Sequence, residues 1–283
     1  HGLAFLPDGR LAVGQRGTAH IIHAFDLQKK EKTTLVEAHN NGHPWNLEVN
    51  PDDKMLYIAY KGSAEIGRIN PNQGNNQQVE VVVSGLSNAM DVKFDSKGNM
   101  YVLCRDERKV YKYPKGNFNN ASKQTFVHLS NSLGGLYSMD FDANDNLIIG
   151  AENDGFYVVT SDGKATKFAG NGKGSTDGEA GQPLTAQLIQ PVAIVVDKTR
   201  GDIYFTDPYN HKVRRIRPGA KGYEDATIST VAGTGTGGKQ DGDGSVAQLK
   251  MPHGLAMSPD GNTLYFTDLD NYILRKITIT VKD

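Results

Sequence analysis

The sequence predicts an all-β fold, a six-bladed β-propeller, and three observations carry this prediction. One pattern of short apolar strands and turns recurs six times along the 283 residues. Its period, between 44 and 61 residues, is that of a four-stranded propeller blade. No long amphipathic helix interrupts the repeat, and 32 glycines supply residues that suit many tight turns.

Each repeat begins with an apolar first strand, passes through an Asp-, Asn- or Gly-rich turn, and enters a second strand. The last repeat shows this best, with Leu255 in the first strand, 258–262 in the turn and 264–268 in the second strand. Such turns between apolar runs are typical of β-hairpins. The equivalent first-strand anchors are Leu3, Leu47, Val92, Met139, Ile194 and Leu255.

Third and fourth strands complete the repeats. Third strands are predicted at 20–25, 109–113, 212–216 and 272–277, and fourth strands at 33–36, 79–83, 124–128, 165–168 and 227–231. The sixth repeat stops after its third strand, so we expect its outer strand to come from residues before His1 or to be absent. The segments 175–188 and 239–249 are each expected to hold one short helical turn. The approximate repeats 1–42, 43–86, 87–133, 134–188, 189–249 and 250–283 fill the chain as a single domain.

Composition narrows the classes of function. The 31 basic and 32 acidic side chains leave a net charge of −1, which argues against a nucleic-acid partner. No run of 18 apolar residues exists, so no transmembrane segment is expected. The single cysteine, Cys104, lies in a predicted strand and is expected to be a small buried residue.

Two stretches carry the signature of a known repeat. The segments 230–235, 241–244, 247–249 and 252–256 resemble the NHL repeat, and so do 169–172, 176–178, 186–188 and 190–191. The run from Tyr204 to Arg214 resembles the segment that gives the family its name, through Asp207, Asn210 and His211. The last repeat keeps Asn271 but has Tyr272 where the family has His. The match is strong in repeats five and six and weak over 1–160.

The resemblance implies several functions. NHL propellers include protein scaffolds, ligand and RNA binders, and a few metal-dependent lyases or hydrolases, so the fold alone does not decide. Long Gly/Asp linkers look like those of bacterial cell-surface proteins that join an NHL propeller to an IPT/TIG domain. This resemblance implies a periplasmic or cell-surface location and an adjacent domain of that type.

Residues just before the first-strand anchors are the candidate ligand site. Two positions upstream of successive anchors stand His1, Trp45, Met90, Tyr137, Val192 and His253, followed by Gly2, Asn46, Asp91, Ser138, Ala193 and Gly254. Aromatic faces with a few polar groups suit a glycan or another planar small molecule, with Trp45 and Tyr137 stacking and Asn46, Asp91 and His253 orienting. The alternative interpretation is that these side chains close the top of the core.

Histidines offer an enzymatic alternative. We expect His1 and His253 to lie in neighbouring repeats, and His43 could be a third ligand for Zn. This arrangement resembles the histidine-bound metal of amidating lyases. A weaker likeness, in residues 258–265, is to calcium-dependent lactonases, for which Asn46 and Asp91 could be oxygen ligands.

Charged residues after the second strands form a further set. Arg16, Lys61 and Arg105 follow the second strands of three consecutive repeats, whereas Asp207 and Asp268 follow those of the last two. This asymmetry could orient an anionic ligand, or it could be an ordinary solvated rim. The acidic linker residues Asp177, Glu179, Asp241 and Asp243 lack EF-hand spacing and are interpreted as turn residues.

The basic cluster around Arg214 does not extend across other repeats. Alternation along a strand sends Arg214 to the face opposite Arg215 and Arg217, which argues against RNA binding. No nucleophile elbow, phosphate loop or zinc-protease motif is present. The sequence therefore favours a non-enzymatic binding or scaffold propeller, with no required cofactor, whose partner is a glycan, a small molecule or a protein. The alternative is a metal-dependent lyase or hydrolase holding Zn or Ca.

Overall fold

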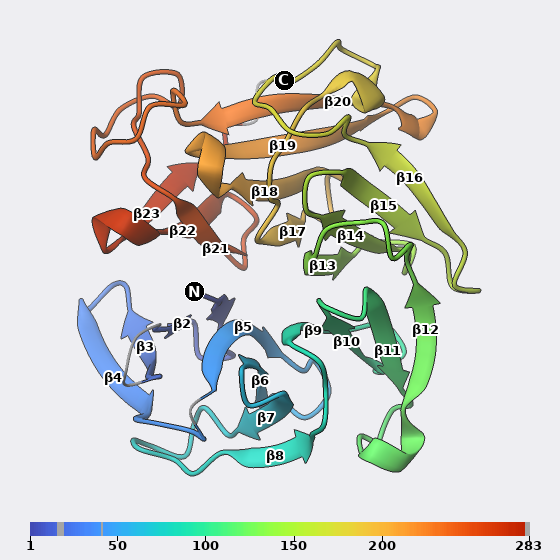
Figure 1. The fold of residues 1–283 in the computed structure, drawn as a ribbon. Helices are drawn as coiled ribbons and strands as arrows, with labels where there is room; N and C mark the ends of the chain where they lie inside the picture. Colours follow the sequence, from blue (N-terminus) through green and yellow to red (C-terminus); the bar gives the residue numbers. More distant parts are fainter. Residues whose placement is uncertain (16–19, 41, 281–283) are drawn as a thin grey trace. The chain divides into compact units, whose positions relative to one another are not determined.

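Six antiparallel sheets make up the protein, as Figure 1 shows for a computed structural model that describes residues 1–15, 20–40 and 42–280. The chain groups into two compact units, His1–Leu129 and Ser130–Asp283, each holding three sheets. Strands follow one another in sequence order within every sheet, which is the meander of a propeller blade. The predicted six-bladed, all-β propeller fold is confirmed, whereas its description as a single domain stays a prediction.

The first unit contains blades 1 to 3. Blade 1 comprises β1 (Leu3–Phe5), β2 (Leu11–Gly14), β3 (Ile22–Asp26) and β4 (Glu31–Val36). Blade 2 comprises β5 (His43–Val49), β6 (Leu56–Lys61), β7 (Glu65–Ile69) and β8 (Glu80–Val83). Blade 3 comprises β9 (Ala89–Phe94), β10 (Met100–Cys104), β11 (Lys109–Tyr113) and β12 (Gln124–His128), with the short 3₁₀ turn η1 (Asn120–Ser122) before its last strand.

The second unit contains blades 4 to 6. Blade 4 comprises β13 (Leu136–Phe141), β14 (Leu147–Ala151), β15 (Gly155–Val159) and β16 (Ala165–Ala169). Blade 5 comprises β17 (Ile194–Val196), β18 (Ile203–Asp207), β19 (Lys212–Gly219) and β20 (Gly222–Ala232). Blade 6 comprises β21 (Pro252–Met257), β22 (Thr263–Asp268) and β23 (Ile273–Thr278). The 3₁₀ turns are η2 (Pro183–Thr185), η3 (Pro208–Asn210) and η4 (Leu269–Asn271).

The repeat positions were well predicted. All six anchors lie in first strands, and each is at most 5% exposed. Blade 6 has three strands among the residues that the structure describes, as expected. The expected helical turn in 175–188 is η2, but 239–249 contains a turn at 244–246 and no helix. The third strand of blade 6 begins at Ile273, because Tyr272 takes a left-handed conformation (φ 56°) that caps η4.

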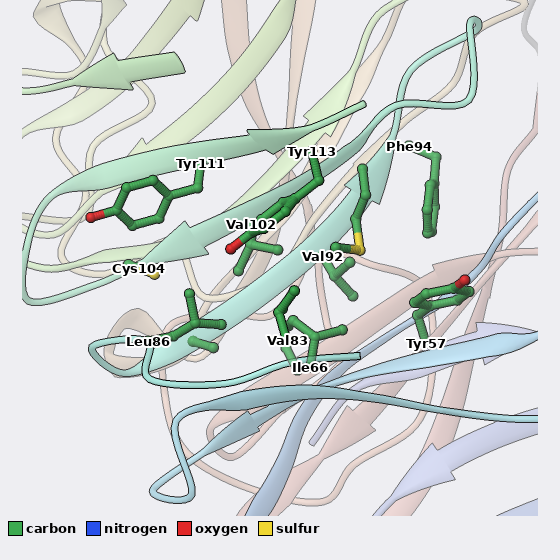
Figure 2. Packing of buried hydrophobic residues seen from close by; sticks show 13 residues of the cluster. Tyr57, Ile66, Val83, Leu86, Val92, Phe94, Val102, Cys104, Tyr111 and Tyr113 are labelled. Carbon is green, nitrogen blue, oxygen red and sulfur yellow. The ribbon is translucent and has the colours of Figure 1, made fainter. Parts of the chain in front are cut away.

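The core lies between successive blades. Figure 2 shows blades 2 and 3 packed together, with Ile66 and Val83 of blade 2 facing Val92 and Val102 of blade 3. Cys104 belongs to the same cluster and is fully buried, as its place in a strand predicted. In the second unit, Phe156 and Phe205 bring blades 4 and 5 into contact, with ring centroids 4.7 Å apart. Within each unit, successive blades therefore bury the faces that they turn toward one another.

In blades 3, 4 and 5 the hairpin turn between the first and second strands has an acidic anchor. In blade 3, Asp95 accepts hydrogen bonds from the backbone N–H of Lys97 and Asn99, and in blade 4 Asp142 binds the turn in the same way. In blade 5, Asp197 also accepts a bond from the Arg200 guanidinium, at 2.8 Å. Aspartate suits this place because its side chain can replace the missing backbone acceptor of the turn. Within the described residues, no helix is long and apolar enough to cross a membrane.

Candidate functional site

The predicted ligand positions coincide with irregularities in the first strands. Trp45, Met90 and Tyr137 are each the additional residue of a β-bulge in β5, β9 and β13. His253 lies in the corresponding register shift of β21. A bulge breaks the strict alternation of a strand and re-aims one side chain. In four of the six blades these positions therefore lie at a register shift of the first strand. The sequence had identified them only by their position within the repeat.

Trp45 is the most developed of these positions. It is partly exposed, and the imidazole of His1 stacks on it with ring centroids 4.6 Å apart and an angle of 24° between the planes. The ammonium of Lys61, at the end of β6, lies 4.4 Å from the centroid of the Trp45 ring. A cation at that distance is attracted to the indole face. The structure therefore brings three predicted residues together around one aromatic ring.

The predicted polar residues have a different role. The Asn46 amide donates to Oδ1 of Asp91 across 2.6 Å, which joins blade 2 to blade 3. Oδ1 of Asp91 also accepts the backbone N–H of Val92, and Asp91 is fully buried. In the second unit, Oγ of Ser138 accepts the N–H of Ile194 at 3.1 Å and joins blades 4 and 5. These groups fasten neighbouring blades, so their part in ligand binding stays a prediction.

The remaining predicted residues are mostly covered. Met90 is fully buried, Tyr137 is 7% exposed and His253 is 6% exposed. The carbonyl of His253 accepts the Thr206 hydroxyl at 2.7 Å, another link between adjacent blades. The low exposure of these side chains favours the interpretation that they close the core rather than meet a ligand.

The three cations predicted to form a rim are Arg16, Lys61 and Arg105, and the two that the structure describes do not share one environment. Arg16 lies outside the described residues. Arg105 forms an ion pair with Asp106 at 2.9 Å, and Lys61 belongs to the Trp45 cluster. Lys61 is therefore the rim cation that lies beside a partly exposed aromatic ring.

Three further histidines of the first unit have close partners. His43 contacts the edge of His20, with ring centroids 4.4 Å apart. His39 binds the carboxylate of Glu65 at 2.5 Å, and both side chains are less than 10% exposed. Among the described residues, no group of three or more His, Cys, Asp or Glu side chains is arranged to hold a metal. His1 and His43 belong to the first unit and His253 to the second, and a metal held by all three stays a prediction.

A pocket of about 360 Å³ lies elsewhere, between blades 2 and 3 of the first unit. Its charged lining is already paired. Arg68 binds Glu80 through two hydrogen bonds of 2.9 and 2.7 Å, and Lys115 binds Asp52 at 2.8 Å. The Arg68 guanidinium holds the pKa of Glu80 below its usual range. Both cations of the lining, Arg68 and Lys115, are therefore already bound to carboxylates.

Sequence reasoning missed the function of the acidic linkers. The buried Asp207 accepts from Asn210 at 2.8 Å and from Arg214 at 3.0 Å. Arg214 also binds Asp177, in the linker before blade 5, at 2.9 Å, and donates to the carbonyl of Gln187 at 2.6 Å. We call this arrangement of Asp177, Asp207, Asn210 and Arg214 the linker clasp. Asp177 is therefore more than a turn residue, because it ties the linker to the third strand of the blade.

Blade 6 repeats the linker clasp with equivalent residues. Asp268 accepts from Asn271 at 2.8 Å and from Arg275 at 2.9 Å, and Arg275 reaches Asp241 of its own linker at 2.6 Å. The spacing of seven residues between the buried Asp and the Arg is the same in both blades. The conserved geometry explains why repeats five and six share the Asp-x-x-Asn element, with an Arg seven residues after the Asp.

Comparison with known proteins supports the repeat type. The chain is 26% identical over 245 residues to the Protein SUPPRESSOR OF QUENCHING 1, chloroplastic, of Arabidopsis thaliana, covering 83% of the chain and 19% of that protein. It is 31% identical over 103 residues to NHL repeat-containing protein 2 of Gallus gallus, covering 36% of the chain and 14% of that protein. The aligned segments thus span a fifth or less of these relatives. No protein-family model matches the chain.

Solved structures share the fold at low sequence identity. A protein of unknown function from Bacteroides thetaiotaomicron has a TM-score of 0.78 and 18% identity, covering 98% of this chain and 68% of that one. An auxiliary nutrient binding protein from the same organism has a TM-score of 0.76 and 18% identity, with 97% and 68% covered. A streptogramin B lyase reaches 0.64 at 14% identity, with 100% and 83% covered. At these identities the likeness shows the fold alone.

Proposed function

Since this chain is an NHL-repeat β-propeller, we propose that it is a non-enzymatic binding module whose ligand stacks at Trp45. The observation that carries the proposal is a partly exposed indole with the Lys61 ammonium over its ring, 4.4 Å from the ring centroid. An exposed aromatic side chain that holds a cation suits a planar or sugar ring that carries a carboxylate. An acidic glycan is therefore the ligand class we propose.

Two structural features support Trp45 as a preorganised binding residue. The bulge at Trp45 frees its side chain from strand alternation, and His1 stacks on the indole. A side chain that is already held loses little conformational freedom when a ligand arrives. The auxiliary nutrient binding protein among the structural neighbours is consistent with a binding role for the same fold.

Calorimetric titration with a panel of acidic and neutral oligosaccharides tests the proposal. We expect saturable binding of an acidic member, abolished in Trp45→Ala and weakened about tenfold in Lys61→Gln, because a charge-assisted contact is lost. Lys97→Gln is the matched control, since Lys97 is an exposed lysine of the same unit in a turn. In the wild-type protein, quenching of Trp45 gives a second readout, because it is the only tryptophan. Binding that survives Trp45→Ala would refute the site.

The second candidate is a metal-dependent lyase or hydrolase that holds its metal through His1, His43 and His253. The lyase among the structural neighbours motivates it, through the fold alone. Elemental analysis of untagged protein purified without chelator tests it. About one Zn or Ca per chain, lost when His43 is changed to Ala, would favour the enzyme over the binding module.

We further propose that the module works outside the cytoplasm, at the cell surface or in the periplasm. The support is its resemblance to NHL proteins of bacterial surfaces. Fractionation of cells that make the native protein, followed by immunodetection, tests this location, and recovery in the cytoplasmic fraction alone would contradict it.

A further inference from the structure

The pocket between blades 2 and 3 of the first unit lies apart from the predicted ligand positions. Its volume of about 360 Å³ falls within the range of pockets that hold small molecules, about 300–1,000 Å³. The turn between β5 and β6 and the outer strand β8 line it from blade 2, and the segment after β11 lines it from blade 3. Trp45 and Lys61 do not belong to this lining, so the pocket is a second concave site.

The charges of the lining do not balance. Asp52, Asp53 and Glu80 bring three negative charges, whereas Arg68 and Lys115 bring two positive ones, which leaves a net charge of −1. Both cations already bind carboxylates, Arg68 through two hydrogen bonds to Glu80 and Lys115 through an ion pair with Asp52. An anionic ligand would have to displace a carboxylate from one of these cations. A cationic ligand instead compensates the excess negative charge, so the pocket favours a cation.

Asp53 is the carboxylate with room for a further donor. Its Oδ1 accepts the backbone N–H of Met55 at 2.9 Å, and its Oδ2 accepts the Tyr57 hydroxyl at 2.9 Å. The Arg68 guanidinium lies 3.7 Å from Oδ2, which is beyond hydrogen-bond distance. A carboxylate has about four lone-pair sites, and the Asp53 side chain is 34% exposed. Asp53 can therefore accept hydrogen bonds from a ligand without losing those it already has.

An apolar wall stands beside these charges. Phe118 and Val82 line the pocket and pack against the core cluster between blades 2 and 3. The Phe118 ring is held by two aromatic neighbours, with centroids 6.1 Å from that of Tyr57 and 6.0 Å from that of Phe94. Methylene groups laid on this wall leave water, which favours a ligand with an aliphatic stem.

We propose that this pocket binds a primary alkylammonium ion. The ammonium group donates to Asp53 and lies close to the Glu80 carboxylate, and its aliphatic stem packs on Phe118 and Val82. A primary ammonium suits Asp53 better than a quaternary one, because it carries three N–H donors. Free aliphatic amines and the lysine side chain share this chemistry.

Titration of the ¹⁵N-labelled whole chain with n-butylammonium chloride near neutral pH, followed by NMR of the backbone amides, tests the proposal. We expect saturable shifts at the amides of Val82 and Gly116, which line the pocket. Butanol and butyrate have the same stem without the cation and are expected to bind at least about tenfold more weakly. From ethylammonium to butylammonium, affinity should rise about threefold for each methylene group that is buried.

Two variants place the cation in the pocket. Asp53→Asn is expected to weaken butylammonium binding about tenfold, and Glu80→Gln about fivefold, because each removes one negative charge from the lining. Glu31→Gln is the matched control, since Glu31 and Glu80 are both exposed and each is the first residue of the outer strand of its blade. Circular dichroism checks that all three variants keep the wild-type fold, and Glu80→Gln still decides the matter if Asp53→Asn unfolds.

A blocked lysine, Nα-acetyl-lysine methylamide, separates the two sources of the ammonium group. Binding as tight as that of butylammonium would support a lysine of a partner polypeptide, and weaker binding would support a free amine. Equal binding of butanol, butyrate and butylammonium would overturn the proposal. So would the absence of saturation below about 100 mM butylammonium, or equal affinities of the wild type and the folded pocket variants. Because the ligand and the residues differ from those at Trp45, neither result bears on the glycan site.

Discussion

Arg214→Met removes the centre of the linker clasp of blade 5 while keeping a side chain of similar length. Arg214 is fully buried, and its guanidinium binds the carboxylates of Asp177 and Asp207 and the carbonyls of Thr176 and Gln187. Asp207 is fully buried as well. Without the arginine, Asp207 keeps the Asn210 amide at 2.8 Å but loses the only cation recorded beside it in the described residues.

Leaving one member of a buried ion pair uncompensated costs about 3–5 kcal/mol of unfolding free energy. We expect Arg214→Met to fall in this range. Arg275→Met is the matched comparison, because Arg275 has equivalent partners but one of them, Asp241, is 90% exposed. A pair with an exposed carboxylate contributes about 0–1 kcal/mol. The loss for Arg275→Met should therefore be smaller, by about 1 kcal/mol.

Equilibrium unfolding in urea, followed by far-UV circular dichroism, gives both values, provided that the slope of the transition is unchanged. The double variant Arg214→Met, Asp207→Leu is expected to recover much of the loss, since replacing a whole buried pair by apolar residues is often neutral. A loss below about 1 kcal/mol for Arg214→Met, or an equal loss for Arg275→Met, would refute the account of the clasp.

Three further predictions concern single residues. Gly155→Ala should lower the free energy of unfolding by about 2 kcal/mol or more, because a Cβ at this position (φ 150°) would lie 1.9 Å from the Ala169 carbonyl oxygen. Gly9→Ala is the control: at φ 87°, with no atom within 4 Å of the added Cβ, it should cost only the backbone strain of about 1–2 kcal/mol, and equal urea midpoints for the two variants would contradict this prediction. Burial raises the pKa of the Cys104 thiol to about 12, so the native protein should react with a disulfide reagent at about pH 8 far more slowly than the unfolded protein, and rapid native labelling would show the thiol to be accessible. Burial opposes ionisation of Asp197, but the hydrogen bonds that it accepts from Arg200 and the turn hold its pKa below the usual value. Its contribution to stability is therefore present above about pH 4 and is lost as pH falls through the lowered pKa. In Asp197→Asn the free energy of unfolding should fall less steeply on acidification than in the wild type, and an unchanged pH dependence would argue against this account.

Strand positions could be predicted because the information is local. Alternating apolar residues and Asp/Gly turns recur in every repeat, and the structure places β11 and β12 at the predicted residues 109–113 and 124–128. Strand alternation also separated Arg214, which is buried, from Arg217, which binds Asp202 at 2.9 Å. The start of β23 was predicted one residue too early, because Tyr272 has a left-handed backbone conformation that ends η4. The pattern of apolar residues gives no sign of such a conformation.

Side-chain roles depended on distant partners and were harder to predict. Asp177 and Asp241 look like turn residues locally, but their arginine partners lie 37 and 34 residues further along the chain. Asn46 and Asp91 look like ligand groups in a loop, yet they bind each other across 45 residues. Repeat alignment gave Trp45 and His1 equivalent positions but assigned Lys61 to a separate set, so the contact of Lys61 with the Trp45 ring was not predicted. The bulge that re-aims Trp45 has no sequence signal that we can identify.

The linker clasp also bears on how the protein is made. Asp177 leaves the ribosome before the residues it holds, since Arg214 follows 37 residues later and Thr230 follows 53 residues later. At a synthesis rate of about 5–20 residues per second, the linker carboxylate waits about 3–10 s for the last of these partners. By then the strands of blades 1 to 4 have already been synthesised, so the residues that complete blade 5 are added after them. The order of translation thus sets the order in which linkers become fixed.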